Sequence, residues 1–268
     1  MPRYICAGCG LQHEDSPEPP AACAVCSDER QYVLPTGQRW TTHEEIASNH
    51  RVRIERDGSL LGLGITPSFA IPQRALLVPD GTSNILWDCT SLATDEAVEA
   101  IQAAGGVHTI AISHPHFYSS MVEWSDALGG VPIYLHEADR QWVQRRTANI
   151  EFWRGDSCQL SDSLTLLHLP GHFPGSASLH CAQGPDGRSL LLAGDSVHVA
   201  QDRRHVTFMY SVPNYIPMHP DAVVRIASRL SEYEFDDLYG FTWGLNIFGD
   251  ASLAVKRSLD RYLAAVGR

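Results

Sequence analysis

Hydrophobic and polar positions along the chain predict β-hairpins in its first third. Residues 51–55 alternate charged with apolar side chains, and residues 60–66 follow an Asp-Gly pair, a pattern typical of a hairpin. Residues 74–78 and 84–88, joined through Pro-Asp-Gly-Thr-Ser, predict a second hairpin. The sequence therefore predicts that a sheet begins in this part of the chain.

Helical and strand patterns alternate after these hairpins. Segments with helical character and capping signals lie at 41–49, 94–104, 120–128, 137–145, 220–230 and 251–266. Short apolar runs typical of buried strands lie at 107–112, 131–135, 164–169, 176–181, 189–194 and 235–239. The chain is therefore predicted to be a mixed α/β protein in which helices cover sheets.

Two histidines follow the apolar run 107–112. In an extended segment, residues two positions apart point to the same side, so His114 and His116 are predicted to direct both imidazoles at one point. Pro115 between them restricts the backbone. Such a pair is half of a transition-metal site.

Two later strands end in the same kind of residue. His172 follows the run 164–169, and Asp195 follows the run 189–194. A single histidine at a strand end is usually a surface or structural residue. Three strand ends that supply three histidines and a carboxylate instead indicate one shared metal site.

These motifs resemble those of the metallo-β-lactamase fold superfamily. The matching elements are His-x-His after a strand, Pro-Gly-His172-x-Pro-Gly-Ser, and Leu-Leu-Ala-Gly-Asp195, and the match extends from about residue 54 to the C-terminus. The resemblance implies an αββα four-layer sandwich with metal-binding loops along one edge. The superfamily includes hydrolases of lactams, thioesters, lactones and phosphodiesters as well as iron-dependent oxygenases, so the fold alone does not name the reaction.

The chain departs from the superfamily pattern at the second metal site. The usual Asp-His pair after His-x-His is replaced by Tyr118 and Ser119, and residues 239–244 lack the expected last histidine. The resemblance therefore implies a mononuclear centre of His114, His116 and His172. Asp195 is expected either to be the fourth ligand or to orient the nucleophilic water.

The N-terminal segment contains two Cys-x-x-Cys units. Cys6, Cys9, Cys23 and Cys26 have the spacing of a tetrahedral thiolate site, and so short a segment buries too little to fold without an ion. It resembles a rubredoxin-like zinc ribbon, which implies a structural zinc, and a redox iron centre stays open. We predict a ribbon unit at 1–35 and a metallo-β-lactamase-like domain at 36–268.

Composition restricts the partners. The 268 residues carry a net charge of -11, which disfavours binding to a phosphate backbone. No run is long and apolar enough to span a bilayer, and the N-terminus lacks the apolar core of a secretory signal. We expect a cytoplasmic protein with a small-molecule substrate and no nucleic-acid or membrane partner, and a homo-oligomer stays open.

Several side chains near the predicted ligands are candidates for catalysis or binding. Asp195 is the candidate base, the Tyr118 phenol either donates a hydrogen bond to an oxyanion or fills the lost second site, and His198 is either a proton shuttle or a surface residue. The candidate pocket residues are Phe117, Tyr118, Phe173 and Trp243. They favour an apolar or aromatic substrate.

Three functions fit these observations. The first is a zinc hydrolase of a small ester, thioester or lactone, because bound Zn²⁺ lowers the pKa of its water and supplies hydroxide near neutral pH. The second is a mononuclear Fe²⁺ oxygenase that resembles the persulfide dioxygenases. The third is a non-catalytic binding protein in which the metal is structural.

Overall fold

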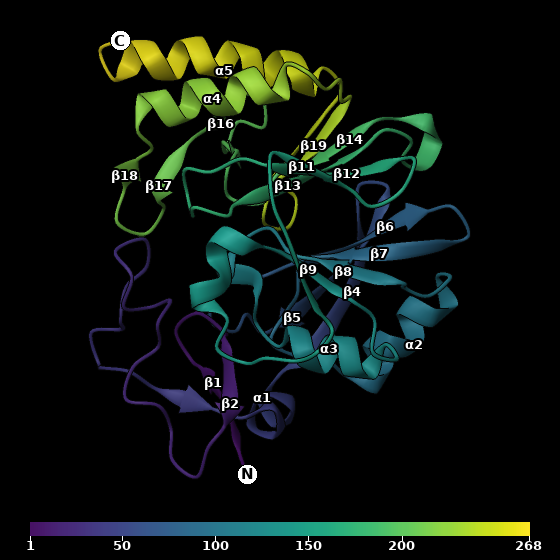
Figure 1. Ribbon diagram of the computed structural model, residues 1–268, viewed down its shortest axis with the longest axis vertical. Coiled ribbons are helices and arrows are strands. Elements are labelled where there is room, and N and C mark those ends of the chain that lie inside the picture. The colour runs from purple at the N-terminus through teal and green to yellow at the C-terminus, as the bar shows by residue number, and fades with distance from the viewer.

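A computed structural model describes residues 1–268 and contains two large β-sheets packed face to face. Helices cover the outer face of each sheet, α4 and α5 on one side and α2 and α3 on the other (Figure 1). The α-helices are α1 (His43–Asn49), α2 (Asp95–Ala103), α3 (Met121–Ala127), α4 (Pro220–Leu230) and α5 (Ala251–Ala265). The four-layer αββα sandwich predicted from the motifs is confirmed.

The first large sheet has the strand order β10-β9-β8-β7-β6-β5-β4. Its hairpins β4/β5 and β6/β7 are antiparallel, and β7 to β10 run parallel. The strands are β4 (Arg51–Asp57), β5 (Leu60–Thr66), β6 (Ala75–Asp80), β7 (Ser83–Trp87), β8 (Thr109–Ala111), β9 (Ile133–His136) and β10 (Ile150–Trp153). Both predicted hairpins are present.

The second large sheet has the order β11-β12-β13-β14-β19-β20. All neighbours in it are antiparallel except β14 and β19. The strands are β11 (Ser157–Gln159), β12 (Leu164–His168), β13 (Ala177–Cys181), β14 (Leu190–Leu192), β19 (Asp237–Tyr239) and β20 (Asn246–Phe248). The strands β10, β11 and β20 were not predicted, because each is short and none has an uninterrupted apolar run.

The remaining elements are short. They are β1 (Arg3–Cys6), β2 (Gln12–Asp15), β3 (Trp40–Thr41), β15 (His198–Val199), β16 (Val206–Thr207), β17 (Met209–Ser211), β18 (Ile216–Pro217), and 3₁₀ helices Pro115–Phe117, Glu137–Trp142 and Pro185–Gly187. The segment predicted at 137–145 is thus a 3₁₀ turn rather than an α-helix. Helix α1 begins as predicted, because Thr42 and Glu45 form a capping box.

Buried apolar residues form separate layers. One cluster lies between the two sheets, a second joins the six-stranded sheet to α4 and α5, and a third joins the seven-stranded sheet to α2 and α3. The four cysteines of the two Cys-x-x-Cys units belong to the third cluster, and β1 pairs with β3 at Trp40–Thr41. The first 35 residues therefore share their core with the following residues, and the division at residue 35 stays a prediction.

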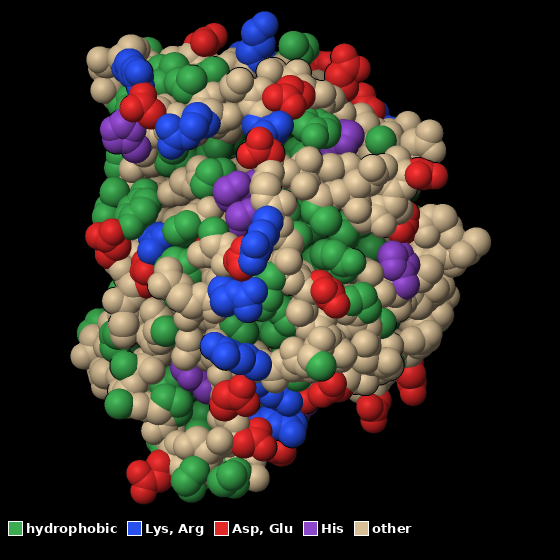
Figure 2. All heavy atoms as spheres, viewed as in Figure 1, with side chains coloured by type: hydrophobic (Ala, Val, Ile, Leu, Met, Phe, Trp, Pro, Cys, Tyr) green, Lys and Arg blue, Asp and Glu red, His purple; other side chains and the backbone are tan.

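Charged side chains of both signs are interspersed over the face shown in Figure 2. Ion pairs such as those of Arg154 and Arg140 with Glu137 place the two signs side by side. None of the helices combines the length and hydropathy that crossing a membrane requires.

Candidate metal centre

Three imidazoles and one carboxylate surround a single point at the edge of the two sheets. Asp195 Oδ2 lies 3.4 Å from His114 Nε2, 3.8 Å from His116 Nδ1 and 3.6 Å from His172 Nε2. His116 Nδ1 and His172 Nε2 are 3.3 Å apart. Four ligands at Zn–N and Zn–O distances of about 2.0–2.2 Å form a tetrahedron with edges of about 3.3–3.6 Å. These residues therefore fit one metal ion of that size.

The ligands come from the ends of three strands. His114 and His116 follow β8, His172 follows β12, and Asp195 follows β14. The predicted reason for the convergence of the first pair was wrong, because Pro115–Phe117 is a 3₁₀ turn and not an extended segment. The two rings meet because His114 directs Nε2 and His116 directs Nδ1 at the same point.

Hydrogen bonds fix the rings of two ligands. His114 Nδ1 lies 2.9 Å from Ser113 Oγ, and Asp88 Oδ1 accepts from both Oγ and the backbone N–H of Ser113 at 2.8 Å. His172 Nδ1 donates to the carbonyl of Tyr210 at 3.0 Å. With Nδ1 engaged in this way, Nε2 of each ring is left to bind a metal.

Electrostatics favours the protonation states that a metal requires. Burial lowers the pKa of His114 and lowers that of His172 well below its ordinary value. Burial alone would raise the pKa of Asp195, but the surrounding imidazoles, His114 first, hold it well below its usual range. Neutral imidazoles and an ionised carboxylate are the ligand forms. His114 Nε2 and Asp195 Oδ1 are buried without a hydrogen bond, as expected of atoms that face an ion or its water.

The four cysteines form a second cluster. Cys6 Sγ lies 3.5 Å from Cys26 Sγ, and Cys9 Sγ lies 3.6 Å from Cys23 Sγ. A tetrahedron with Zn–S distances of about 2.3 Å has edges of about 3.8 Å, so the set fits a thiolate-bound ion. Gly8 N–H and Gln38 Nε2 both donate to Cys6 Sγ, at 3.4 and 3.2 Å. Such donors stabilise a thiolate.

A cavity of about 280 Å³ opens onto the histidine site. His116 and Asp195 line it, and its other walls are Gly8, Gln31, Tyr32, Ala70, Ile71, Pro72, Val212, Pro213 and Phe241. Sequence reasoning missed most of these residues, because they come from five segments that lie far apart along the chain. The features of the sequence that could have indicated these walls are the aromatic residues Tyr32 and Phe241, the second of which follows the predicted strand at 235–239.

Two of the aromatic residues that were predicted to line the pocket, Phe117 and Phe173, pack against the histidines instead. Phe117 packs edge-on to His114 with ring centroids 5.2 Å apart, and Phe173 packs edge-on to both His116 and His172 at 5.1 Å. Both rings are fully buried and do not line the cavity. They therefore pack against the histidine rings and do not contact the space of the cavity.

The other three candidate residues also have defined places. Tyr118 is buried in the same apolar cluster as Phe117 and outside the cavity lining. Trp243 lies against the backbone of Gly62 and beneath Arg53, away from the cavity. The ring of His198 lies 4.7 Å from that of Phe241, and its Nδ1 is buried without a hydrogen bond.

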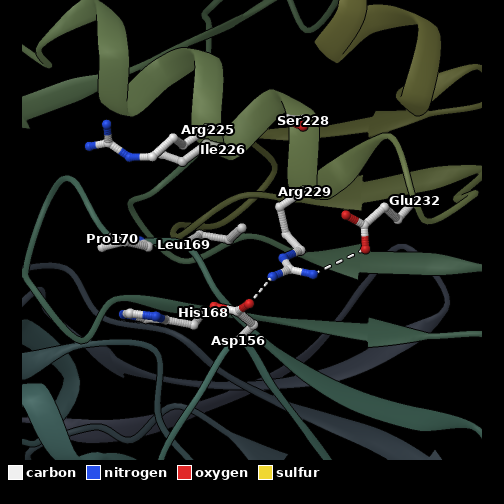
Figure 3. A pocket seen from close by; sticks show the side chains of 9 residues that line it. All are labelled: Asp156, His168, Leu169, Pro170, Arg225, Ile226, Ser228, Arg229 and Glu232. Atoms are coloured by element: carbon white, nitrogen blue, oxygen red, sulfur yellow. Dashed lines mark hydrogen bonds and ion pairs between the residues drawn. The ribbon is translucent and has the colours of Figure 1, made fainter.

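A second depression, of about 370 Å³, lies between the end of β12 and α4 (Figure 3). Arg229 extends from α4 toward Asp156, with which it pairs at 2.6 Å, and it also pairs with Glu232 at 3.0 Å. These acidic partners already neutralise Arg229, so this arginine is not free to anchor an anion in the depression.

Ser113→Ala is expected to weaken metal binding at the histidine site about 10- to 100-fold, since residues that orient a ligand typically contribute this much. The substitution removes the hydroxyl between Asp88 and His114 Nδ1 but no ligand. Competition with a chelator measures the affinity. Ser163→Ala is the matched control, because that hydroxyl contacts Asp80, far along β6 from the site.

Comparisons with known proteins identify the fold. The chain is similar to the solved structure of the DIM-1 metallo-beta-lactamase, with a TM-score of 0.59 and 18% identity over 81% of this chain and 99% of that chain. It is also similar to the class B3 di-zinc metallo-beta-lactamase LRA-12 from an Alaskan soil metagenome, with a TM-score of 0.52 and 18% identity over 79% and 92% of the chains. The chain therefore has the metallo-β-lactamase fold.

A curated relative identifies the family. YmaE of Bacillus subtilis (strain 168), an uncharacterized protein, is 40% identical over 269 residues, covering 99% of this chain and 97% of YmaE. The chain belongs to the same family as YmaE. No protein-family model matches it.

Proposed function

We propose that the protein is a metal-dependent hydrolase with one catalytic metal ion, acting on a small ester, thioester or lactone. The observation that supports this most directly is the cluster of His114, His116, His172 and Asp195, two of which, His116 and Asp195, line an open cavity. A buried set of neutral imidazoles and one carboxylate is a donor set for Zn²⁺ and other divalent transition metals.

The metal, when bound, polarises a carbonyl oxygen and makes water acidic enough to lose a proton near neutral pH. Asp195 Oδ2 lies among the three imidazoles, while its Oδ1 has no hydrogen-bond partner. We assign Oδ1 to orienting the attacking water and accepting its proton. We assign the relay of that proton to His198, whose ring packs against that of Phe241 in the cavity wall.

A mononuclear centre is supported by the residues at the second-site positions. Tyr118 is buried among apolar side chains, and burial holds the pKa of its phenol well above the ordinary value. Ser119 Oγ donates to the carbonyl of Cys89. We therefore assign Tyr118 to filling the space of the lost site rather than to stabilising an oxyanion.

The substrate class follows from the cavity walls. Asp195 is the one Asp, Glu, Lys or Arg side chain among the residues that line the cavity. A substrate with a carboxylate or phosphate would find no cation there other than the metal itself, whereas Ile71, Tyr32 and Phe241 offer apolar surface. We therefore expect uncharged carbonyl compounds to be better substrates than anionic ones.

Elemental analysis of protein purified without added metal, followed by an ester, thioester and lactone panel, tests the proposal. We expect about two zinc ions per chain, one in each cluster, and turnover of uncharged substrates that ends when a chelator removes the histidine-site ion. Iron at the histidine site with substrate-dependent O₂ uptake would overturn hydrolysis in favour of oxygenation. A histidine site that stays empty in added Zn²⁺ would overturn an enzymatic role.

A further inference from the structure

A buried glutamine links the four-cysteine cluster to the histidine site. Gln73 is 4% exposed, and its Nε2 donates to the carbonyl of Cys9 at 3.2 Å and to the carbonyl of His116 at 2.6 Å. One amide group therefore holds the backbone of a cysteine ligand and the backbone of a histidine ligand. Ser91 Oγ donates to Gln73 Oε1 at 3.3 Å and to the carbonyl of Gly10 at 2.9 Å, which fixes the amide.

An arginine makes a second, separate link. Arg30 Nη1 donates to the carbonyl of His172 at 3.3 Å, and its guanidinium lies 4.3 Å from the centroid of Phe173, which itself packs against the ligand rings. Asp28 pairs with Arg30 through both carboxylate oxygens at 2.5 and 2.6 Å. Asp28 follows Cys26 by two residues, so the cysteine loop sets the position of this pair.

The segment that carries Arg30 is also hydrogen-bonded to β17 and to the turn that follows it. Ser211 Oγ donates to the carbonyl of Arg30 at 3.0 Å, and Asn214 Nδ2 donates to the carbonyls of Glu29 and Gln31. The neighbouring Tyr210 carbonyl accepts the hydrogen bond from His172 Nδ1. His172 is therefore held on two sides by groups that the N-terminal segment fixes.

We propose that Gln73 and Arg30 are positioning residues that make the four-cysteine unit part of the histidine metal centre. An ion bound by the four thiolates fixes the backbone at Cys9 and at Cys26, and these two links then fix His116 and His172. Metal binding at the two clusters is therefore thermodynamically coupled, and the coupling is reciprocal. The inference depends on the two metal sites and not on the reaction.

The test measures metal affinity at the histidine site in folded holoprotein. Co²⁺ replaces zinc, because thiolate ligands give intense charge-transfer absorption that distinguishes the cysteine site from the histidine site, and a chelator is titrated. We expect Arg30→Ala and Gln73→Met each to raise the Kd of the histidine site at least tenfold, as residues that orient ligands do. Arg30→Lys keeps the charge and one donor, so it should recover part of the affinity.

Matched controls separate positioning from general destabilisation. Arg39→Ala removes an exposed arginine of the same N-terminal segment, and Gln141→Met removes an exposed glutamine. Both are expected to leave the Kd within twofold. Unchanged affinity in folded Arg30→Ala and Gln73→Met protein, or equal losses in the controls, would overturn the proposal.

A measurement on the unaltered chain covers the case in which the variants do not fold. Loading the histidine site should tighten binding at the cysteine site by the same factor that the cysteine ion tightens the histidine site. We expect the Kd of the cysteine site, measured by competition with a chelator, to be at least fivefold lower when the histidine site is loaded. An equal Kd with the histidine site loaded and with it empty would show that the two sites are independent and would overturn the proposal.

Discussion

Replacing His172 with alanine is expected to empty the histidine site and to lower kcat/KM by about 10³-fold or more, because loss of several kcal/mol of Lewis-acid stabilisation corresponds to that factor. His172 directs Nε2 into the cluster of three imidazoles and Asp195 and is fully buried. Alanine leaves a gap between Phe173 and Asp195, and water in that gap is a weaker ligand than imidazole. Elemental analysis should show one ion fewer per chain, with the four-cysteine site still loaded.

His168→Ala is the control for this variant. His168 lies at the end of the same strand but faces the second depression, where its Nε2 bonds to the carbonyl of Pro174 at 2.7 Å (Figure 3). We expect it to retain both ions and nearly all activity. If His172→Ala kept both ions, or kept its activity after losing one, the histidine site would not be the catalytic centre.

The identity of the candidate ligands could be predicted from sequence because strand ends are local signals. His114, His172 and Asp195 each follow an apolar run. Strands β12 and β14 flank the antiparallel β13 and therefore run in the same direction, and β8 of the facing sheet ends near the same edge. The ring nitrogen that each histidine directs inward could not be predicted. That choice depends on Ser113 and on the carbonyl of Tyr210, which belongs to β17 and lies 38 residues after His172 in the sequence.

The cavity walls were the least predictable part of the site. Proximity in sequence to a ligand favoured Phe117 and Phe173, which the structure places behind the ligands, whereas Tyr32 and Phe241 line the cavity. Tyr32 reaches the cavity because the N-terminal segment packs over the sheet edge through Arg30 and Gln73. Contacts of this kind join residues far apart in sequence and leave no periodic signal.

Helices and long strands were predicted more accurately than short strands. Helix α2 has an N-cap at Thr94 as expected, and both hairpins of the seven-stranded sheet have clear alternation or turn residues. Strand β20 is only three residues long, and its pairing with β19 is stabilised by tertiary contacts rather than by its own apolar content. One of these contacts is the hydrogen bond from Asn246 of β20 to Asp57, which is itself one partner of a buried ion pair.

Arg74→Met is expected to lower the free energy of unfolding by about 3–5 kcal/mol, because removal of one partner of a buried ion pair leaves the other charge unpaired. The Arg74 side chain is 1% exposed and pairs with Asp57, and it donates to the carbonyls of Gly240 and Thr242. Asn246 Nδ2 also donates to Asp57, at 2.6 Å. This network joins the end of β4 and the residue before β6 in one sheet to the loop after β19 and the start of β20 in the other.

Denaturant unfolding followed by circular dichroism measures the effect. Arg56→Met, at an exposed arginine next to Asp57 in β4, should change the free energy of unfolding by less than about 0.5 kcal/mol. The double variant Arg74→Met/Asp57→Leu should recover part of the loss, because neither charge is then left unpaired, although Asn246 and the Gly244 N–H lose their acceptor. A single variant as stable as the parent protein, or a double variant no better than the single one, would contradict this account.

Arg74→Met is also expected to affect the wall of the cavity beside the histidine site. Arg74 holds the carbonyls of Gly240 and Thr242, which lie on either side of Phe241 in the cavity wall. Below its unfolding temperature, Arg74→Met should therefore raise KM for an apolar substrate several-fold while changing kcat less, because the metal ligands are untouched. Metal affinity at the histidine site should stay unchanged in Arg74→Met, because Arg74 donates to no ligand backbone. In Arg30→Ala the affinity should fall, because Arg30 donates to the carbonyl of His172.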